Sequence, residues 1–332
     1  MGAASRSVRC RNIRGQLLKV ELVDRGEFVT PGSALEQRLV VAANQQVFVQ
    51  KWVSKAAGDR DPRRYDLLDK EVRAGTRLGQ VFGDQYPAEL ARLAAYNMDA
   101  EEPFVLLHQY LGEPVVPGAS RLDDGQRRLL QVGLLRALQA TATAGVVHGV
   151  LTLDVVRWDG RRVQLVDFES AQRAGEPRRR VQGAPNRSPE QAAGSGEVDV
   201  RDDLWSAGHV IRTVVMGQSV DGSSDRSGDP EGLKALLDPV FGNPLERRPY
   251  PADLLRMLRA QPQVGQSTDP EIALMPGRER FDRLCASKRG VVSSPSAVAD
   301  PGRSGRSVLR PFPLLAALLL IAVVVVGMVV LG

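Results

Sequence analysis

The run PFPLLAALLLIAVVVVGMVVLG at residues 311–332 contains no charged side chain. About 20 consecutive apolar residues allow an α-helix to cross the hydrocarbon core of a bilayer. A helix buried in a globular domain seldom continues for this length without a polar residue on any face. The sequence therefore predicts a transmembrane helix at 312–331. This segment constrains the fold most, because a backbone inside lipid must satisfy its own hydrogen bonds.

The flanks of this run predict its orientation. Arg303, Arg306 and Arg310 lie on its N-terminal side, and positively charged flanks tend to stay in the cytoplasm. The stretch from Met1 to Lys19 has no apolar core of a secretory signal. We therefore expect a single-pass, tail-anchored protein whose N-terminal domain is cytoplasmic and whose anchor contacts the lipid bilayer.

The net charge of +5 is concentrated beside the predicted anchor. Residues 278–310 carry eight basic and three acidic side chains, whereas the rest of the chain carries 36 of each kind. A basic patch on a folded domain would favour nucleic acid as a partner, but this excess lies next to the membrane segment. We expect no nucleic-acid partner, and we interpret residues 263–310 as a basic juxtamembrane region and flexible linker.

Strand-like segments come first in the remaining chain, and helical patterns follow. Apolar runs typical of β-strands occur at 16–23, 38–43, 46–53 and 104–111. Helical patterns occupy 61–82 and 126–145, and a hairpin is predicted around Asp159–Gly160. This order is typical of an α+β fold. The domain is expected at 14–262, with a β-rich small lobe at about 14–112 and a helical large lobe at about 113–262.

Lys51 ends the strand-like run VFVQKW, and Glu71 lies in LLDKEVRAGTRL. The segments HGVLTLDVV, LVDFESAQ and GAPNRSPEQ follow in that order. The order of these motifs over residues 20–260 resembles the protein-kinase-like superfamily, in a degenerate form of the bacterial membrane-anchored Ser/Thr protein kinases. The resemblance implies that Lys51 holds the phosphates of ATP and pairs with Glu71. It also implies a two-lobed protein-kinase-like fold.

The segment HGVLTLDVV resembles the catalytic loop of that family, but it departs where the chemistry is done. His148 keeps its place, whereas Val150 stands at the position of the catalytic aspartate and Val155 at that of the metal-binding asparagine. Valine has no lone pair for a proton or a cation. No catalytic residue is therefore assigned, and Asp154 is the one candidate for a substitute base.

The segment LVDFESAQ resembles the metal-binding motif that follows the catalytic loop. The resemblance implies that Asp167 coordinates Mg²⁺ and that Phe168 belongs to the structural part of the motif. Glu169 replaces the glycine of the family and adds a negative charge. The candidate phosphate-covering loop has Gly26 and Gly32 but no G-x-G-x-x-G pattern. ATP and Mg²⁺ are therefore expected to bind weakly or not at all.

Later motifs carry scaffold signals rather than catalytic ones. GAPNRSPEQ and RRPYPADLL resemble segments in which Glu190 forms an ion pair with Arg248. DLWSAG resembles a helix whose aspartate, here Asp203, ties down the catalytic loop. The basic run Arg178–Arg180 is interpreted either as a solvated loop or as a docking patch for an acidic or phosphorylated partner.

The resemblance implies a membrane-tethered pseudokinase in the inner or plasma membrane, acting as a scaffold or regulator with protein partners in signalling. Two alternatives remain open. A divergent active enzyme would hold Mg–ATP on Lys51, Glu71 and Asp167. It would use Asp154 or another acid as the base, for Ser/Thr phosphorylation or another nucleotide-dependent transfer. A tail-anchored adaptor would bind no nucleotide at all.

Overall fold

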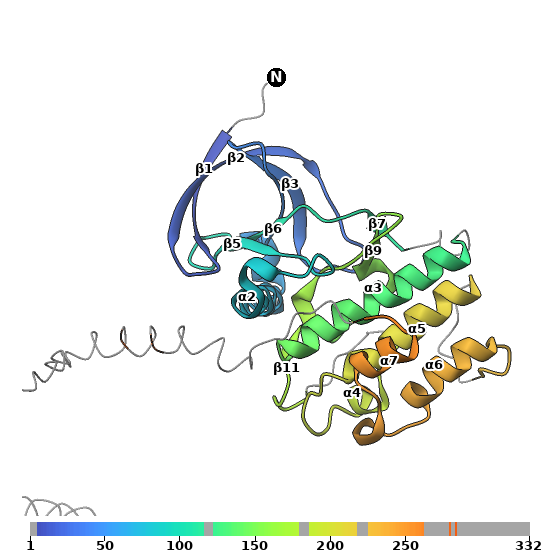
Figure 1. Ribbon diagram of the computed structural model, residues 1–332. Helices are drawn as coiled ribbons and strands as arrows, with labels where there is room; N and C mark the ends of the chain where they lie inside the picture. The colour runs from blue at the N-terminus through green and yellow to red at the C-terminus, as the bar shows by residue number, and fades with distance from the viewer. Residues whose placement is uncertain are drawn as a thin grey trace, which may run out of the picture. The chain divides into compact units, whose positions relative to one another are not determined.

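The computed structural model describes residues 5–115, 122–178, 186–217 and 225–261, together with Glu279 and Arg283. The strands and helices below belong to one compact unit, Met1–Phe281. The first part is rich in strands (Figure 1). Its elements are β1 (Ser5–Asn12), β2 (Leu17–Glu27), β3 (Glu36–Ala42), β4 (Val47–Trp52), α1 (Lys55–Arg60), α2 (Arg63–Phe82), the 3₁₀ turn η1 (Gly83–Gln85), β5 (Leu93–Asn97) and β6 (Phe104–His108).

Six of these strands form a closed antiparallel barrel in the order β1-β2-β3-β4-β6-β5, with β1 pairing to β5 to complete the ring (Figure 1). The register shifts between Asp24 and Gly26 in β2 and between Leu93 and Ala95 in β5. Such bulges bend a strand and help a small sheet to close. Closure removes the unpaired edges of the sheet. The barrel encloses a small apolar core of Cys10, Leu22, Val40, Ala42, Phe48, Ala95, Phe104 and Leu106.

The second part is mainly helical and contains short strands. Its elements are β7 (Glu113–Pro114), α3 (Asp124–Thr143), β8 (Val146–Val147), η3 (Leu153–Val155), β9 (Val156–Trp158), β10 (Val163–Leu165), η4 (Phe168–Ser170), β11 (Gln172–Arg173), α4 (Pro189–Ala193), α5 (Asp202–Met216), α6 (Glu231–Phe241), η5 (Leu245–Arg247) and α7 (Pro251–Met257). The hairpin predicted around Asp159–Gly160 is confirmed, because β9 and β10 pair as antiparallel neighbours.

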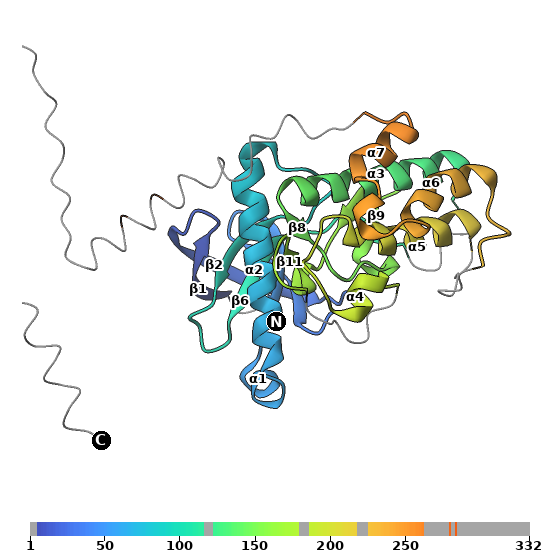
Figure 2. The same cartoon turned by 90° about the horizontal axis from the view of Figure 1, so that it is seen from below.

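Helix α2 joins the two parts. It contacts β5 of the barrel and η4 of the second part. Figure 2 shows α2 between the barrel strands and the segment that carries β8 and β11. The buried face of α2 includes Leu68, Val72 and Leu78, and these side chains belong to the main hydrophobic core. That core continues into α3, which packs against α5, α7 and β10. The turn after β10 is therefore held between α2 and the helical part.

The expected two-lobed protein-kinase-like fold is wrong, and the designation of a kinase-like protein is corrected with it. The finding that overturns it is the closed six-stranded barrel. The sequence prediction did not recognise β1 or β5. Strand β1 reads SRSVRCRN, so its alternation places only Val8 and Cys10 in the barrel core. A strand with so few apolar residues is recognised only once its partners are known.

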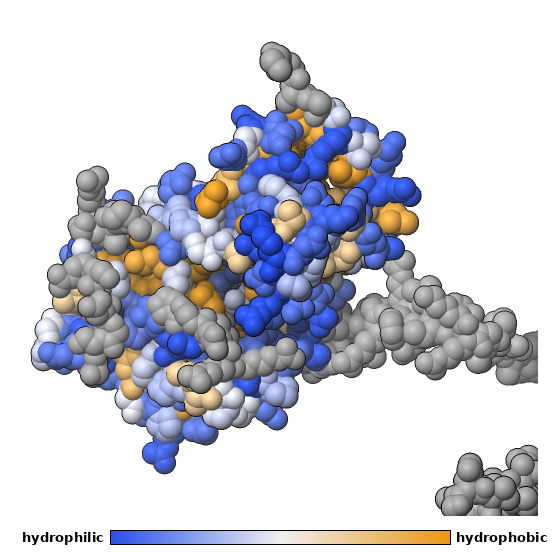
Figure 3. Space-filling model, turned by 180° about the vertical axis from the view of Figure 1, so that it is seen from behind, coloured by the Kyte–Doolittle hydropathy of each residue, from blue (hydrophilic) through white to orange (hydrophobic). Residues whose placement is uncertain are grey.

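Among the residues described, no helix is both long and apolar enough to cross a membrane. The predicted span 312–331 and the predicted linker 263–310 lie outside them, apart from Glu279 and Arg283. The face in Figure 3 is largely hydrophilic, with small apolar patches.

Candidate functional site

A buried cluster of four charged side chains lies where β4, α2 and the turn after β10 meet. Lys51 is on β4, Glu71 on α2, and Asp167 and Glu169 lie at the start of and within η4. The Lys51 Nζ atom lies 3.0 Å from Glu71 Oε2 and 2.9 Å from Glu169 Oε1, and it also bonds to Asp167 Oδ1. All four residues are buried, and Lys51 is 0% exposed. Residues more than 100 positions apart in the sequence thus meet in one ion-pair cluster.

The local backbone brings two carboxylates of η4 to the same ammonium group. Asp167 has φ 62° and ψ 69°, a left-handed conformation that is unfavourable for a residue with a Cβ atom. Such conformations persist where the surrounding contacts hold them, and they cluster at functional sites. Here both Asp167 and Glu169 reach Lys51 from this turn.

The charges in the cluster are unbalanced, with one cation against three carboxylates. Burial raises the pKa of Glu71 to about 7, and the nearby charges of Asp167 and Glu169 act in the same direction against Lys51. Burial alone would lower the pKa of Lys51, but Asp167, Glu169 and Glu71 raise it well above its ordinary value. At neutral pH the lysine is therefore charged, and the Glu71 carboxylate takes up a proton more easily than an ordinary glutamate.

The residues do not fit a magnesium ion in the arrangement observed. The carboxylate oxygens of Glu71, Asp167 and Glu169 lie within 4.8 Å of one another, close enough to share a cation. The Lys51 ammonium already bonds to all three and is the cation of this cluster. Asp167 Oδ2 is buried and has no hydrogen-bond partner among the residues described. A divalent ion would have to displace the lysine, so the arrangement fits an internal ion-pair cluster better than a metal centre.

A tight turn between β2 and β3 covers the cluster. Ser33 N donates to the Thr30 carbonyl, and Gly32 has φ +82°. With Pro31 at the second position, this is the sequence and geometry of a type II turn. Past the turn, Ser33 Oγ donates to Glu169 Oε1 and Ala34 N donates to Glu169 Oε2 at 3.2 Å. The turn is thus bonded directly to the cluster below it.

A second set of side chains packs near the cluster. The ring centroids of Phe28 and Tyr110 are 5.7 Å apart, and the Arg157 guanidinium lies 5.6 and 5.7 Å from them. Arg157 Nε donates to the Leu111 carbonyl at 2.9 Å. Tyr110 and Arg157 are 6% and 4% exposed, and Tyr110 interacts electrostatically with Lys51. Phe28, Tyr110 and Arg157 thus form a packed aromatic and cationic group next to Lys51.

The segment expected to be the catalytic loop is held by Asp203. The backbone amides of His148 and Gly149 donate to the two carboxylate oxygens of Asp203 at 2.6 and 2.9 Å. His148 Nε2 donates to the Val166 carbonyl at 2.8 Å, so this ring is a structural bridge to the strand before Asp167. The centroid of its ring also lies 4.9 Å from that of Phe168.

The positions expected to carry catalysis offer little chemistry. Val155 is buried in the apolar core, and Val150 is half-buried. Asp154, the candidate substitute base, is half-buried and has a 3.5 Å contact with the Thr152 hydroxyl. No interaction of Asp154 with the Lys51 cluster is present in the part of the chain that the structure describes.

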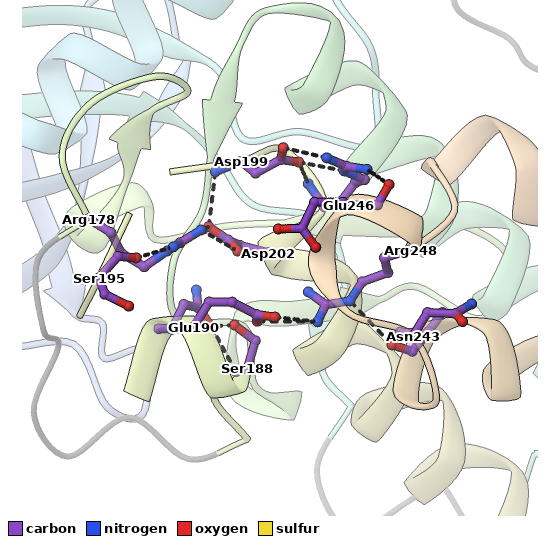
Figure 4. Close-up of polar contacts among 12 residues, drawn as sticks. Arg178, Ser188, Glu190, Ser195, Asp199, Asp202, Asn243, Glu246 and Arg248 are labelled. Carbon is purple, nitrogen blue, oxygen red and sulfur yellow. Dashed lines mark hydrogen bonds and ion pairs between the residues drawn. The ribbon is translucent and has the colours of Figure 1, made fainter. Parts of the chain in front are cut away.

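Glu190 and Arg248 meet in the helical part, as Figure 4 shows. Arg248 Nη2 lies 3.2 Å from both carboxylate oxygens of Glu190, and its Nε donates to the Val240 carbonyl. Arg178 is buried, with its Nη2 atom 3.0 Å from both Asp202 oxygens (Figure 4). This residue is therefore neither solvated nor available for docking, while Arg179 and Arg180 fall outside the described ranges.

Sequence reasoning paired Lys51 with Glu71 but missed the groups that enclose them. Glu169 was noted only as a substitution for glycine, and the donors Ser33 and Ala34 were not considered. Arg157 was missed as well, although a charged residue in the apolar segment VVRW is an unusual feature. In comparisons with known proteins, no family model and no curated protein matches the chain.

Proposed function

We propose that this protein is a non-catalytic scaffold or regulator in signalling, which acts through contacts with other proteins and does not bind ATP. One observation carries the proposal. A lysine ammonium has three hydrogen-bond donors, and the chain's own Glu71, Asp167 and Glu169 supply an acceptor for each. Lys51 is therefore saturated and fully buried, and it has no donor left for the phosphate of a ligand.

The residues at the expected catalytic positions after His148 support the same conclusion. Catalysis of phosphoryl transfer depends on positioning and on stabilising charge at the reacting groups. Val150 and Val155 supply neither a proton acceptor nor a metal ligand. Asp154 contacts Thr152 rather than the Lys51 cluster. A transferase would need both a free lysine and a base, and this arrangement favours neither.

A charged groove between α2 and the segment around β11 supports a role in protein binding. It has a volume of about 710 Å³. Its charged lining residues are Asp66, Asp69, Lys70, Arg73, Arg77, Arg173 and Glu176. A lining with both signs of charge suits a protein segment of complementary charge better than an apolar small molecule.

Thermal unfolding of the full-length protein with ATP and Mg²⁺ or Mn²⁺ tests the proposal. A ligand present at about 100 times its Kd stabilises a folded protein by about 2.7 kcal/mol. For a domain of this size, that free energy raises Tm by roughly 5–10 °C. We expect no such shift at millimolar ATP, and no transfer of the γ-phosphate to a generic protein substrate.

The refuting result is a clear rise in Tm, or phosphotransfer, that disappears in a Lys51→Met variant. A matched control is Lys19→Met, which removes an exposed lysine of β2 from outside the cluster. A response lost in both variants would reflect a general loss of positive charge. A response lost only in Lys51→Met would show that the lysine does hold a nucleotide.

A further inference from the structure

The turn at Thr30–Ser33 is stiff and anchored at both ends. Proline fixes φ at the second position of a type II turn, and glycine accepts the positive φ required at the third. Thr30 is 0% exposed, and its amide and hydroxyl both donate to Gln37 Oε1 at 3.2 and 3.0 Å. Leu35 is buried on the other side. We call Thr30–Leu35 the lid.

The lid presents two donors to one carboxylate. Ser33 Oγ–H and Ala34 N–H each bond to a different oxygen of Glu169, and Lys51 Nζ adds a third donor at 2.9 Å. The Glu169 carboxylate therefore accepts hydrogen bonds from a hydroxyl, a backbone amide and an ammonium group. These are the donors that a protein site would offer to a separate carboxylate ligand. Consistent with this, burial alone would raise the pKa of Glu169, but Lys51 and the Ser33 hydrogen bond lower it.

We propose that Ser33, Ala34 and Lys51 form a carboxylate-binding site that the chain fills with its own Glu169, and that this internal ligand holds the lid closed over the Lys51 cluster. The inference rests on the proposed function and adds its regulation. A ligand or partner can reach Lys51 only by displacing Glu169 and opening the lid. Because the turn is preformed, opening moves the lid as a unit and breaks both of its bonds to Glu169.

Amide hydrogen exchange in full-length Glu169→Ala tests this inference, with Ala34 as the reporter amide. Removing Glu169 leaves Lys51 paired with Glu71 and Asp167 and lowers the excess of negative charge, so the variant is expected to fold. Hydrogen bonds to charged groups are strong enough that their loss should speed exchange at Ala34 by at least about tenfold. The matched control Glu27→Ala removes an exposed carboxylate from the adjacent end of β2 and should leave the rate unchanged.

Rescue by a free carboxylate makes the test specific. Sodium acetate at about 0.1 M should slow the exchange of Ala34 in Glu169→Ala, whereas sodium chloride at the same ionic strength should not. An unchanged exchange rate of the Ala34 amide in Glu169→Ala would overturn the proposal that Glu169 holds the lid closed. If exchange at Ala34 is fast in Glu169→Ala and acetate does not slow it, the proposal of a carboxylate-binding site is wrong.

A second variant keeps the inference testable if Glu169→Ala fails to fold. Ser33→Ala removes only the hydroxyl donor of the lid, and it should speed exchange at Ala34 by a smaller factor. An unchanged exchange rate of the Ala34 amide in Ser33→Ala would also contradict the proposal that Glu169 holds the lid closed. The proposed function fails separately, if the wild-type protein binds ATP in the thermal assay.

Discussion

The pKa of Glu71 gives the sharpest test of the buried cluster. Burial raises the pKa of this carboxyl to about 7, against 4.5 for the ordinary group. A group whose pKa is higher in the folded protein than in the unfolded chain stabilises the fold at low pH, and this stabilisation is lost as the pH rises through the folded value. The Glu71→Gln variant replaces the carboxyl with a neutral amide of nearly the same shape and should abolish this loss.

The magnitude follows from the same two pKa values. The gap between 4.5 and about 7 corresponds to roughly 3 kcal/mol over the full range. As the pH rises from about 5.5 to about 8.5, the loss of the Glu71 proton should lower the free energy of unfolding by about 2 kcal/mol. Glu71 is 1% exposed, so solvent screens its interactions very little.

Urea denaturation at these two pH values measures the effect through the midpoint and the slope. The wild-type protein should lose about 2 kcal/mol more than Glu71→Gln as the pH rises. Glu27→Gln serves as the control, and its pH dependence should follow that of the wild type. Parallel pH profiles for the wild type and Glu71→Gln would refute the assignment of the raised pKa to Glu71.

Three further substitutions test the contacts that hold the helical part and its loop. Arg248→Met leaves the Glu190 carboxylate without its buried partner, and it should lower the free energy of unfolding by about 3 kcal/mol in urea denaturation. Gly149→Ala forces a side chain onto a backbone with φ +85° and places Cβ 2.7 Å from the Ser170 carbonyl, so thermal unfolding should show a loss of about 2 kcal/mol. Asp203→Asn weakens the acceptor of two backbone amides at Gly149 and its neighbour; those amides should exchange faster, with a loss of about 2 kcal/mol. Unchanged stability in any of the three would contradict the contact concerned.

Local patterns predicted several elements of the fold. The helical pattern at 61–82 agrees with α2, which runs from Arg63 to Phe82, and the Asp159–Gly160 turn joins β9 and β10. These features depend on residues close together in the sequence, where periodicity and turn chemistry act. Strand β1 lies before residue 14, where the predicted domain begins, and it pairs with β5 more than 80 residues later. Its own sequence contains no signal of that partner.

The candidate site also has features that the local sequence predicts and features that only the tertiary structure determines. The sequence by itself placed Lys51 at the end of a strand and Glu71 on a helix, because these properties are local. Only the tertiary structure decided that Glu169 would bond to Ser33, Ala34 and Lys51 at once. Which groups bond to one another depends on their distance and on their burial away from water. Both are determined by how β4, α2 and η4 pack together. The same residues in a more open arrangement would leave Lys51 available to a ligand, whereas here the chain itself satisfies it.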